Sequence, residues 1–133
     1  MGRRVSSKLQ QNKLERITRL KTAIASLETY KNFFECQGEL APEDAWVARY
    51  QVRQSQKAYW YYKLQAPSPT FPTRGDTPKL SKYKHLGKAG SEAHVPGVMG
   101  VARRSIVSEL QKNIDSLKNS LLDISFDSEQ EDI

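Results

Sequence analysis

Two strand-like segments separated by a short polar turn constrain the fold of this chain more than any other feature. In residues 46–53 the side chains alternate with the period of a strand, with Trp46, Ala48, Tyr50 and Val52 on one face and Arg49, Gln51 and Arg53 on the other. Four consecutive aromatics, Tyr59 to Tyr62, follow the turn at residues 55–57, and flat rings pack well on the pleated surface of a strand. We therefore expect an antiparallel hairpin whose second strand begins at Ala58.

The second and third strands are each predicted to have two chemically different faces. Alternation sends Trp60, Tyr62 and Leu64 to the core side and Tyr59, Tyr61 and Lys63 to the exposed side. The third strand is expected over residues 79–86 and closes at Gly87, with Lys82 and Lys84 on one face and Tyr83 and His85 on the other. Together the strands predict an antiparallel sheet that is aromatic inside and basic outside.

A long amphipathic helix is predicted before the sheet, over residues 8–37. Its apolar residues recur at helical spacing: Leu14, Ile17, Leu20, Ile24, Leu27, Tyr30 and Phe34. Residues 1–7 are expected to form a frayed, disordered basic terminus, with Ser6 or Ser7 as the cap of the helix. Gly38 and then Pro42 are expected to end it.

A second long helix is predicted over residues 98–124. Its apolar residues repeat as the narrow seam of a coiled coil: Val107, Leu110, Ile114, Leu117, Leu121 and Ile124. Such a short seam needs a partner, and both an antiparallel pair with the first helix and a homodimeric bundle satisfy it. Before this helix, Ser91 is expected to cap a turn, and Pro96-Gly97 is expected to prevent a continuous helix. The acidic residues 125–133 are expected to be a disordered tail.

These elements predict the α+β class, with a long N-terminal helix, a three-stranded antiparallel sheet and a long C-terminal helix packed antiparallel on the first. The chain has 133 residues, which suits one domain, here residues 8–124. Residues 67–78 hold four of the six prolines and must form a long extended loop between the second and third strands. We expect this loop either to be mobile beside the sheet, with Arg74 available to a partner, or to be disordered.

Positive charge is concentrated in the predicted sheet. The chain has 21 Lys and Arg against 15 Asp and Glu, but residues 45–88 contain nine bases and a single acid, Asp76. Such a local field attracts phosphates or acidic partners.

The residue types argue against several functional classes. His85 and His94 are the only histidines, and neither comes with the carboxylates or nucleophile of a recognisable catalytic set, so we expect no enzymatic activity. The single Cys36 with these two histidines makes no metal site, and no cofactor is expected. With no secretory signal and no long apolar run, we expect a cytoplasmic protein without membrane contact.

The sheet therefore supplies the candidate binding residues. Bases that neutralise phosphates and rings that stack on bases or contact sugars are expected to converge on its exposed face. Arg103 and Arg104 are added because cations in the first turns of a helix oppose its dipole, which hints at a ligand or at an acidic neighbour such as Glu92. The nucleic-acid-binding set is Arg49, Arg53, Tyr59, Tyr61, Lys63, Arg74, Lys82, Lys84, Lys88, Arg103 and Arg104.

Three segments carry a resemblance to known proteins: Trp-Val-Ala-Arg-Tyr, Tyr-Trp-Tyr-Tyr-Lys-Leu and Ser-Lys-Tyr-Lys-His-Leu-Gly-Lys-Ala-Gly-Ser. They resemble a family of small, uncharacterised bacterial proteins, mostly cyanobacterial. More loosely, three such strands followed by a helix resemble the N-terminal DNA-binding domain of tyrosine recombinases, which lays its sheet in the major groove. That resemblance implies that Arg49, Arg53, Lys63, Lys82 and Lys84 face DNA. The chain departs from it in the proline-rich loop and has no catalytic recombinase domain.

The function expected from the sequence is non-enzymatic nucleic-acid binding, with DNA as the preferred partner, in an accessory factor of a mobile element or plasmid. The helices are expected to supply dimerisation. The alternative is a protein-interaction adaptor that docks an acidic or other partner through its helical seam or a sheet edge; a merely solvated sheet face is the remaining interpretation.

Overall fold

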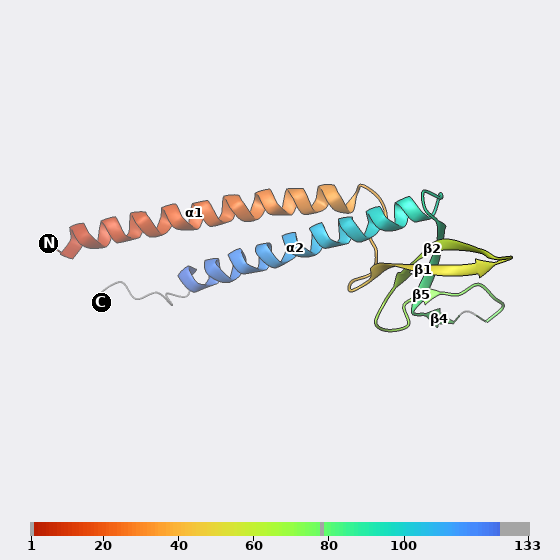
Figure 1. The fold of residues 1–133 in the computed structure, drawn as a ribbon. Coiled ribbons are helices and arrows are strands. Elements are labelled where there is room, and N and C mark those ends of the chain that lie inside the picture. The colour runs from red at the N-terminus through yellow and green to blue at the C-terminus, as the bar shows by residue number, and fades with distance from the viewer. Residues whose placement is uncertain (1, 78, 126–133) are drawn as a thin grey trace. The chain divides into compact units, whose positions relative to one another are not determined.

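One long helix precedes all of the strands in the sequence, and a second long helix follows them. The structure is a computed structural model that describes residues 2–77 and 79–125. Its elements are α1 (Gly2–Glu35), β1 (Trp46–Gln54), β2 (Lys57–Gln65), β3 (Phe71–Pro72), β4 (Leu80–Ser81), β5 (Tyr83–Lys88) and α2 (His94–Ser125), shown in Figure 1. The predicted α+β class, with two long helices in contact and a three-stranded antiparallel sheet, is confirmed.

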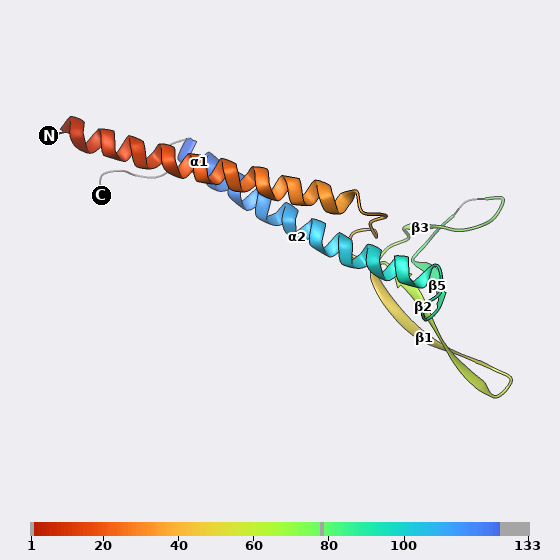
Figure 2. The same cartoon turned by 90° about the horizontal axis from the view of Figure 1, so that it is seen from above.

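The chain divides into a helical unit, residues 1–34 with 107–133, and a sheet unit, residues 35–106. In the helical unit α1 and the later part of α2 run alongside each other in both Figure 1 and Figure 2. Leu20 shares a surface hollow with Ile124, whereas Lys31 shares another with Gln111, so the two helices are antiparallel. Of the two partners left open for the seam, the intramolecular one is therefore formed.

Apolar seam residues hold the two helices together. Ile114 is 1% exposed, and Ile24, Val107 and Ile124 are also buried, as the heptad pattern predicts. At the edge of the seam the Lys118 Nζ atom lies 3.3 Å from the Glu28 Oε1 atom, but both side chains are about half exposed, so the ion pair contributes little. Burial of the seam is the main source of stability in this unit.

The bounds of α1 differ from the prediction. The helix begins at Gly2, so the caps assigned to Ser6 or Ser7 are wrong. Residues 2–7 contain no proline, and a helix that is already nucleated extends through them at little cost in free energy. It ends at Glu35, and Gly38 lies beyond the end with a φ of 156°. Gly38 instead leaves room for a guanidinium, because a Cβ there would lie 3.1 Å from Arg103 Nη1.

The start of α2 also differs from the prediction. The helix begins at His94, and the His94 backbone N–H donates to Ser91 Oγ at 3.2 Å, which confirms Ser91 as a cap. The expectation that Pro96-Gly97 interrupts the helix is wrong. Pro96 lies in the first turn, where backbone N–H groups have no intrahelical partner and the fixed φ of proline suits the helix.

The main sheet has the strand order β1-β2-β5, and both pairs of strands are antiparallel. The predicted hairpin of β1 and β2 is confirmed, although its turn contains only Ser55 and Gln56 and β2 begins at Lys57. Both turn residues have positive φ, 50° for Ser55 and 66° for Gln56, as a two-residue turn of type I′ requires.

The proline-rich segment contains structure that the sequence did not predict. Two residues of it, Phe71–Pro72, form β3 and pair with β4, Leu80–Ser81. The Thr70 N–H donates to the Ser81 carbonyl at 2.9 Å and the Thr73 N–H donates to the Lys79 carbonyl at 2.8 Å. The single third strand expected over residues 79–86 is therefore wrong: its beginning joins β3, and β5 starts only at Tyr83.

The core of the sheet unit lies on one face of the sheet. Leu64, Ala66, Phe71 and Leu86 are buried together, and Tyr62 and Val101 pack against them. Phe71 thereby anchors the proline-rich segment, and Val101 brings the first turns of α2 onto the same face. Trp60, predicted to be core, is 45% exposed, because it lies beyond the part of β2 that β5 pairs with.

Met1, Pro78 and residues 126–133, which carry most of the predicted acidic tail, lie outside the described residues. Within the described part, neither helix is long and apolar enough to cross a membrane.

Candidate nucleic-acid interface

The face of the sheet opposite the core carries a continuous set of tyrosines and lysines. Residues directly opposite each other on paired strands share a face, and the pairs on this side are Tyr50 with Tyr61, Val52 with Tyr59, Lys63 with His85, Gln65 with Tyr83 and Tyr61 with Lys88. We call this surface the tyrosine–lysine face: Tyr50, Tyr59, Tyr61, Lys63, Tyr83, His85 and Lys88.

The rings of this face form a connected array. Tyr50 stacks beside Tyr61 with ring centroids 5.9 Å apart and an interplanar angle of 27°. The Tyr50 hydroxyl and His85 Nδ1 are 3.0 Å apart and share a hydrogen bond. These contacts join all three strands of the sheet, so the ring positions are fixed by the pairing of the strands.

Both lysines of the face lie over tyrosine rings. The Lys63 Nζ atom is 5.1 Å from the ring centroid of Tyr50 and 4.3 Å from that of Tyr83. The Lys88 Nζ atom is 4.7 Å from the Tyr59 centroid and 5.9 Å from the Tyr61 centroid. Such cation–π contacts position an ammonium group and leave its N–H donors free for an anion. Neither lysine forms an ion pair with a described residue.

The electrostatic character of the sheet is uniform. Strands β1, β2 and β5 contain no Asp or Glu, so no carboxylate on them neutralises the lysines. Tyr83 is 42% exposed, Lys88 and His85 are exposed, and Tyr50, Tyr59 and Tyr61 are half-buried. The face therefore offers flat apolar rings beside unneutralised cations, the combination that binds sugar-phosphate chains and bases.

Three predicted site residues lie on the opposite face. The register pairs Arg49 with Tyr62, Arg53 with Ala58 and Lys84 with Leu64, which places them on the core side of the sheet or on its extension. The predicted convergence of these residues with Tyr59, Tyr61 and Lys63 is therefore wrong. The Arg49 guanidinium lies 4.1 Å from the ring of Trp60, so this second face has an arginine–tryptophan pair of its own.

Lys82 and Arg74 occupy the edge of the sheet unit. The Lys82 carbonyl accepts a hydrogen bond from the Ala66 N–H at 2.8 Å just before β5. Arg74 follows β3 and lines an open groove of about 750 Å³ together with Tyr83, Lys84 and His85. The groove thus adjoins the tyrosine–lysine face at Tyr83 and His85.

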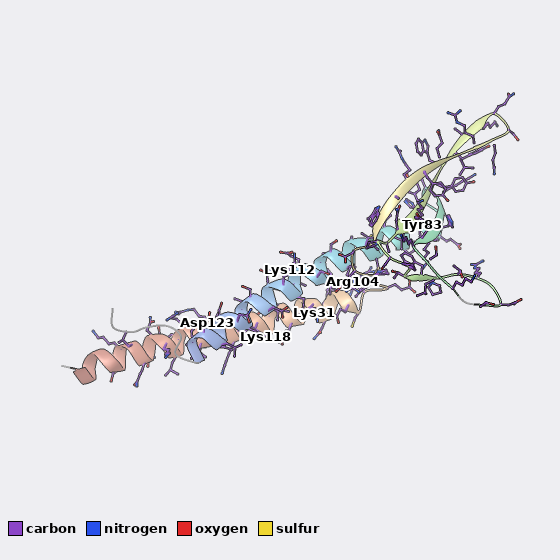
Figure 3. All side chains as sticks on the ribbon, turned by 90° about the horizontal axis from the view of Figure 1, so that it is seen from below. Lys31, Tyr83, Arg104, Lys112, Lys118 and Asp123 are labelled. Atoms are coloured by element: carbon purple, nitrogen blue, oxygen red, sulfur yellow. The ribbon has the colours of Figure 1, made fainter. Side chains whose placement is uncertain are left out.

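Arg103 and Arg104 have structural partners. Arg103 Nη1 donates to the Glu39 carbonyl at 2.6 Å, and Arg104 Nε donates to the Ala41 carbonyl at 2.7 Å. Because α2 begins at His94, neither arginine is in its first turn, and the argument from the helix dipole does not apply. Figure 3 shows Arg104 on α2 and apart from Tyr83, so Arg104 is not part of the tyrosine–lysine face.

The alternating pattern does not identify Tyr50, Tyr83 and His85 as members of the site. It divides each strand into two faces without stating which one is covered, and it predicts these three residues inside the sheet. The two-residue turn could have placed Tyr50, since it fixes Tyr50 opposite Tyr61, which is predicted on the exposed side. Tyr83 and His85 are placed only by the pairing of β5 with β2.

The remaining histidine has a local role. His94 Nδ1 accepts a hydrogen bond from the Gly90 N–H at 2.9 Å, and its ring lies 4.1 Å from that of Tyr62 on the core side. In the described ranges, no three His, Cys, Asp or Glu side chains gather as a metal site would need.

Comparisons with known proteins do not assign the site. The sequence matches no protein-family model, and neither curated proteins nor solved structures give a match. The functional assignment therefore rests on the side chains of the described residues.

Proposed function

We propose that the chain is a non-enzymatic nucleic-acid-binding protein that uses its tyrosine–lysine face, with DNA as its natural partner. The observation that carries the proposal is the position of the two lysines over the rings of Tyr50, Tyr59, Tyr61 and Tyr83 on strands without a carboxylate. Each ammonium group neutralises a phosphate and releases counterions. The rings beside it pack against sugars or against unpaired bases.

A pair of lysine variants tests this assignment. Lys63 and Lys84 belong to neighbouring pairs on opposite faces, so Lys63→Met and Lys84→Met remove the same charge from the two sides of the sheet. Affinity for a DNA oligonucleotide is measured across a salt titration. Lys63→Met is expected to reduce the slope of log affinity against log salt by about 0.7 to 0.9, the value of one lost phosphate contact, and Lys84→Met to leave it unchanged.

A tyrosine variant tests the contribution of the rings. Tyr61 lies at the centre of the array, and Tyr61→Leu keeps an apolar side chain on the strand while removing the ring. On a single-stranded DNA probe, whose bases are free to stack, loss of one stacked base lowers affinity by about 1–3 kcal/mol, roughly 5- to 150-fold, with little effect on the salt slope. Equal slopes for both lysine variants, together with unchanged affinity for Tyr61→Leu, would show that nucleic acid does not bind this face.

The open edge of β1 favours a second candidate function, the protein-interaction adaptor. The helical seam is occupied within the chain, but β1 is nine residues long and pairs with β2 on one side only. An unpaired edge of this length can accept a strand from another protein. In that case amide hydrogen exchange of β1 would slow in the complex, and Lys63→Met would have no effect on its affinity.

A further inference from the structure

The β1–β2 hairpin extends beyond the rest of the sheet. Strand β5 pairs with β2 only from Tyr61 to Gln65, whereas β1 and β2 continue to pair out to Gln54 and Lys57. Residues 51–60 are therefore a two-stranded arm, and Figure 2 shows its tip away from β5. All of its residues are exposed except Val52 and Tyr59, which are half-buried.

The composition of the arm is unusual for a solvated hairpin. Its polar side chains are Gln51, Arg53, Gln54, Ser55, Gln56 and Lys57, with no acid among them. None of the six makes a hydrogen bond or an ion pair through its side chain with a described residue. An ordinary surface hairpin mixes charges of both signs, whereas the arm offers cations and amides whose donors and acceptors are all available.

The turn keeps side chains where glycine is the favoured residue. Ser55 and Gln56 both hold a positive φ, which disfavours residues with a Cβ atom. An Asn-Gly turn would close the same hairpin without this strain. A strained residue at the outermost point of the arm is consistent with a use for the Gln56 side chain.

The dimensions of the arm fit one groove of a nucleic acid. Its two strands lie about 5 Å apart, and four facing pairs extend it by roughly 10 Å before the turn. The major groove of B-form DNA is about 12 Å wide and 8.5 Å deep and admits a two-stranded ribbon. The major groove of A-form RNA is too deep and narrow for side chains to read.

We propose that the arm enters the major groove of duplex DNA by its tip, where Arg53, Gln54 and Gln56, from both faces of the hairpin beside the turn, contact base edges. Glutamine forms paired hydrogen bonds with adenine and arginine with guanine, so these residue types suit the groove floor. Lys57 at the base of the turn and the tyrosine–lysine face contact the adjacent phosphates. The inference rests on the proposed function and adds to it a preference for DNA duplex over RNA duplex.

The test compares three probes of one mixed sequence: duplex DNA, duplex RNA and single-stranded DNA. The arm variant is Arg53→Ala with Gln56→Gly, which removes two tip side chains and places glycine at a positive φ, so the hairpin is retained. The wild-type chain is expected to bind duplex DNA at least about tenfold more tightly than duplex RNA. The arm variant is expected to lose about tenfold on duplex DNA and less than about threefold on single-stranded DNA.

The possible outcomes distinguish binding by the arm from binding by the tyrosine–lysine face. Equal affinity of the wild-type chain for the two duplexes overturns the inference, as does an arm variant whose losses are the same on all three probes or absent from all. If Lys63→Met still lowers the salt slope in that case, the tyrosine–lysine face stands without the arm. If none of the probes binds the wild-type chain, both proposals are wrong.

Discussion

The contact between Gly97 and Leu86 decides how closely α2 approaches the core face of the sheet, and it gives a stability prediction whose sign is informative. A Cβ atom on Gly97 would lie 2.7 Å from Leu86 Cδ1 and 2.9 Å from Leu86 Cδ2. Leu86 is 3% exposed and packs with Leu64 and Phe71, so its side chain has little room to move away. The substitution Gly97→Ala therefore forces a shift of the helix or of the core.

Two opposing effects set the magnitude. Alanine is favoured over glycine in a helix interior by about 1 kcal/mol. Overpacking of a filled core costs about 1–3 kcal/mol, and here both terminal methyl groups of Leu86 are closer than van der Waals contact allows. We expect overpacking to dominate and Gly97→Ala to lower the free energy of unfolding by about 1 kcal/mol.

Urea denaturation measures this change, and two further variants serve as controls. Ala102→Gly makes the reverse exchange at an exposed position of the same helix and is expected to lower stability by about 1 kcal/mol through propensity alone. Leu86→Val in the Gly97→Ala background makes room for the new methyl group, so the two substitutions should be less than additive. A gain of about 1 kcal/mol for Gly97→Ala alone would refute the close contact between α2 and the sheet.

The turn residue Gln56 and the hydrogen bond of Arg104 each give a further prediction. Gln56→Gly should raise the free energy of unfolding by about 1 kcal/mol in the same urea assay, because glycine adopts the φ of 66° without a Cβ clash, and a loss of stability would contradict the assigned turn. Arg104→Met should lower stability by about 1–2 kcal/mol, because it leaves the Ala41 carbonyl without its charged donor, while the affinity for nucleic acid stays unchanged. A large loss of affinity with normal stability would instead return Arg104 to the binding set.

The sequence predicts the fold correctly wherever the spacing of neighbouring residues defines a helix, a strand or a cap. The period of two in β1 and the aromatic run in β2 predicted the hairpin, and the heptad of α2 predicted the seam that buries Ile114. Ser91 was identified as a cap from its residue type and position. The bounds of the helices were less well predicted, because proline in a first turn, as at Pro96, does not end a helix.

The candidate site could be predicted only in part. The alternating pattern predicts Tyr59, Tyr61 and Lys63 on one side of the sheet, where the structure has them. It also predicts Arg49, Arg53 and Lys84 on that side, whereas the register sends these three to the other side. Composition shows that the strands are basic, but it does not show the register in which the antiparallel strands pair. A shift of the alignment by one residue moves every side chain to the other face.

By itself, then, the sequence determined the two long helices, the β1–β2 hairpin, the α+β class and the excess of positive charge, because periodicity and composition are properties of neighbouring residues. Only the tertiary structure decided which face of the sheet is covered. Leu64 and Leu86 pack with Phe71 and Val101 on one side, so Tyr50, Tyr83 and His85 remain on the other with Lys63. Burial depends on which apolar surface a distant helix and loop can reach, and no local pattern contains that information.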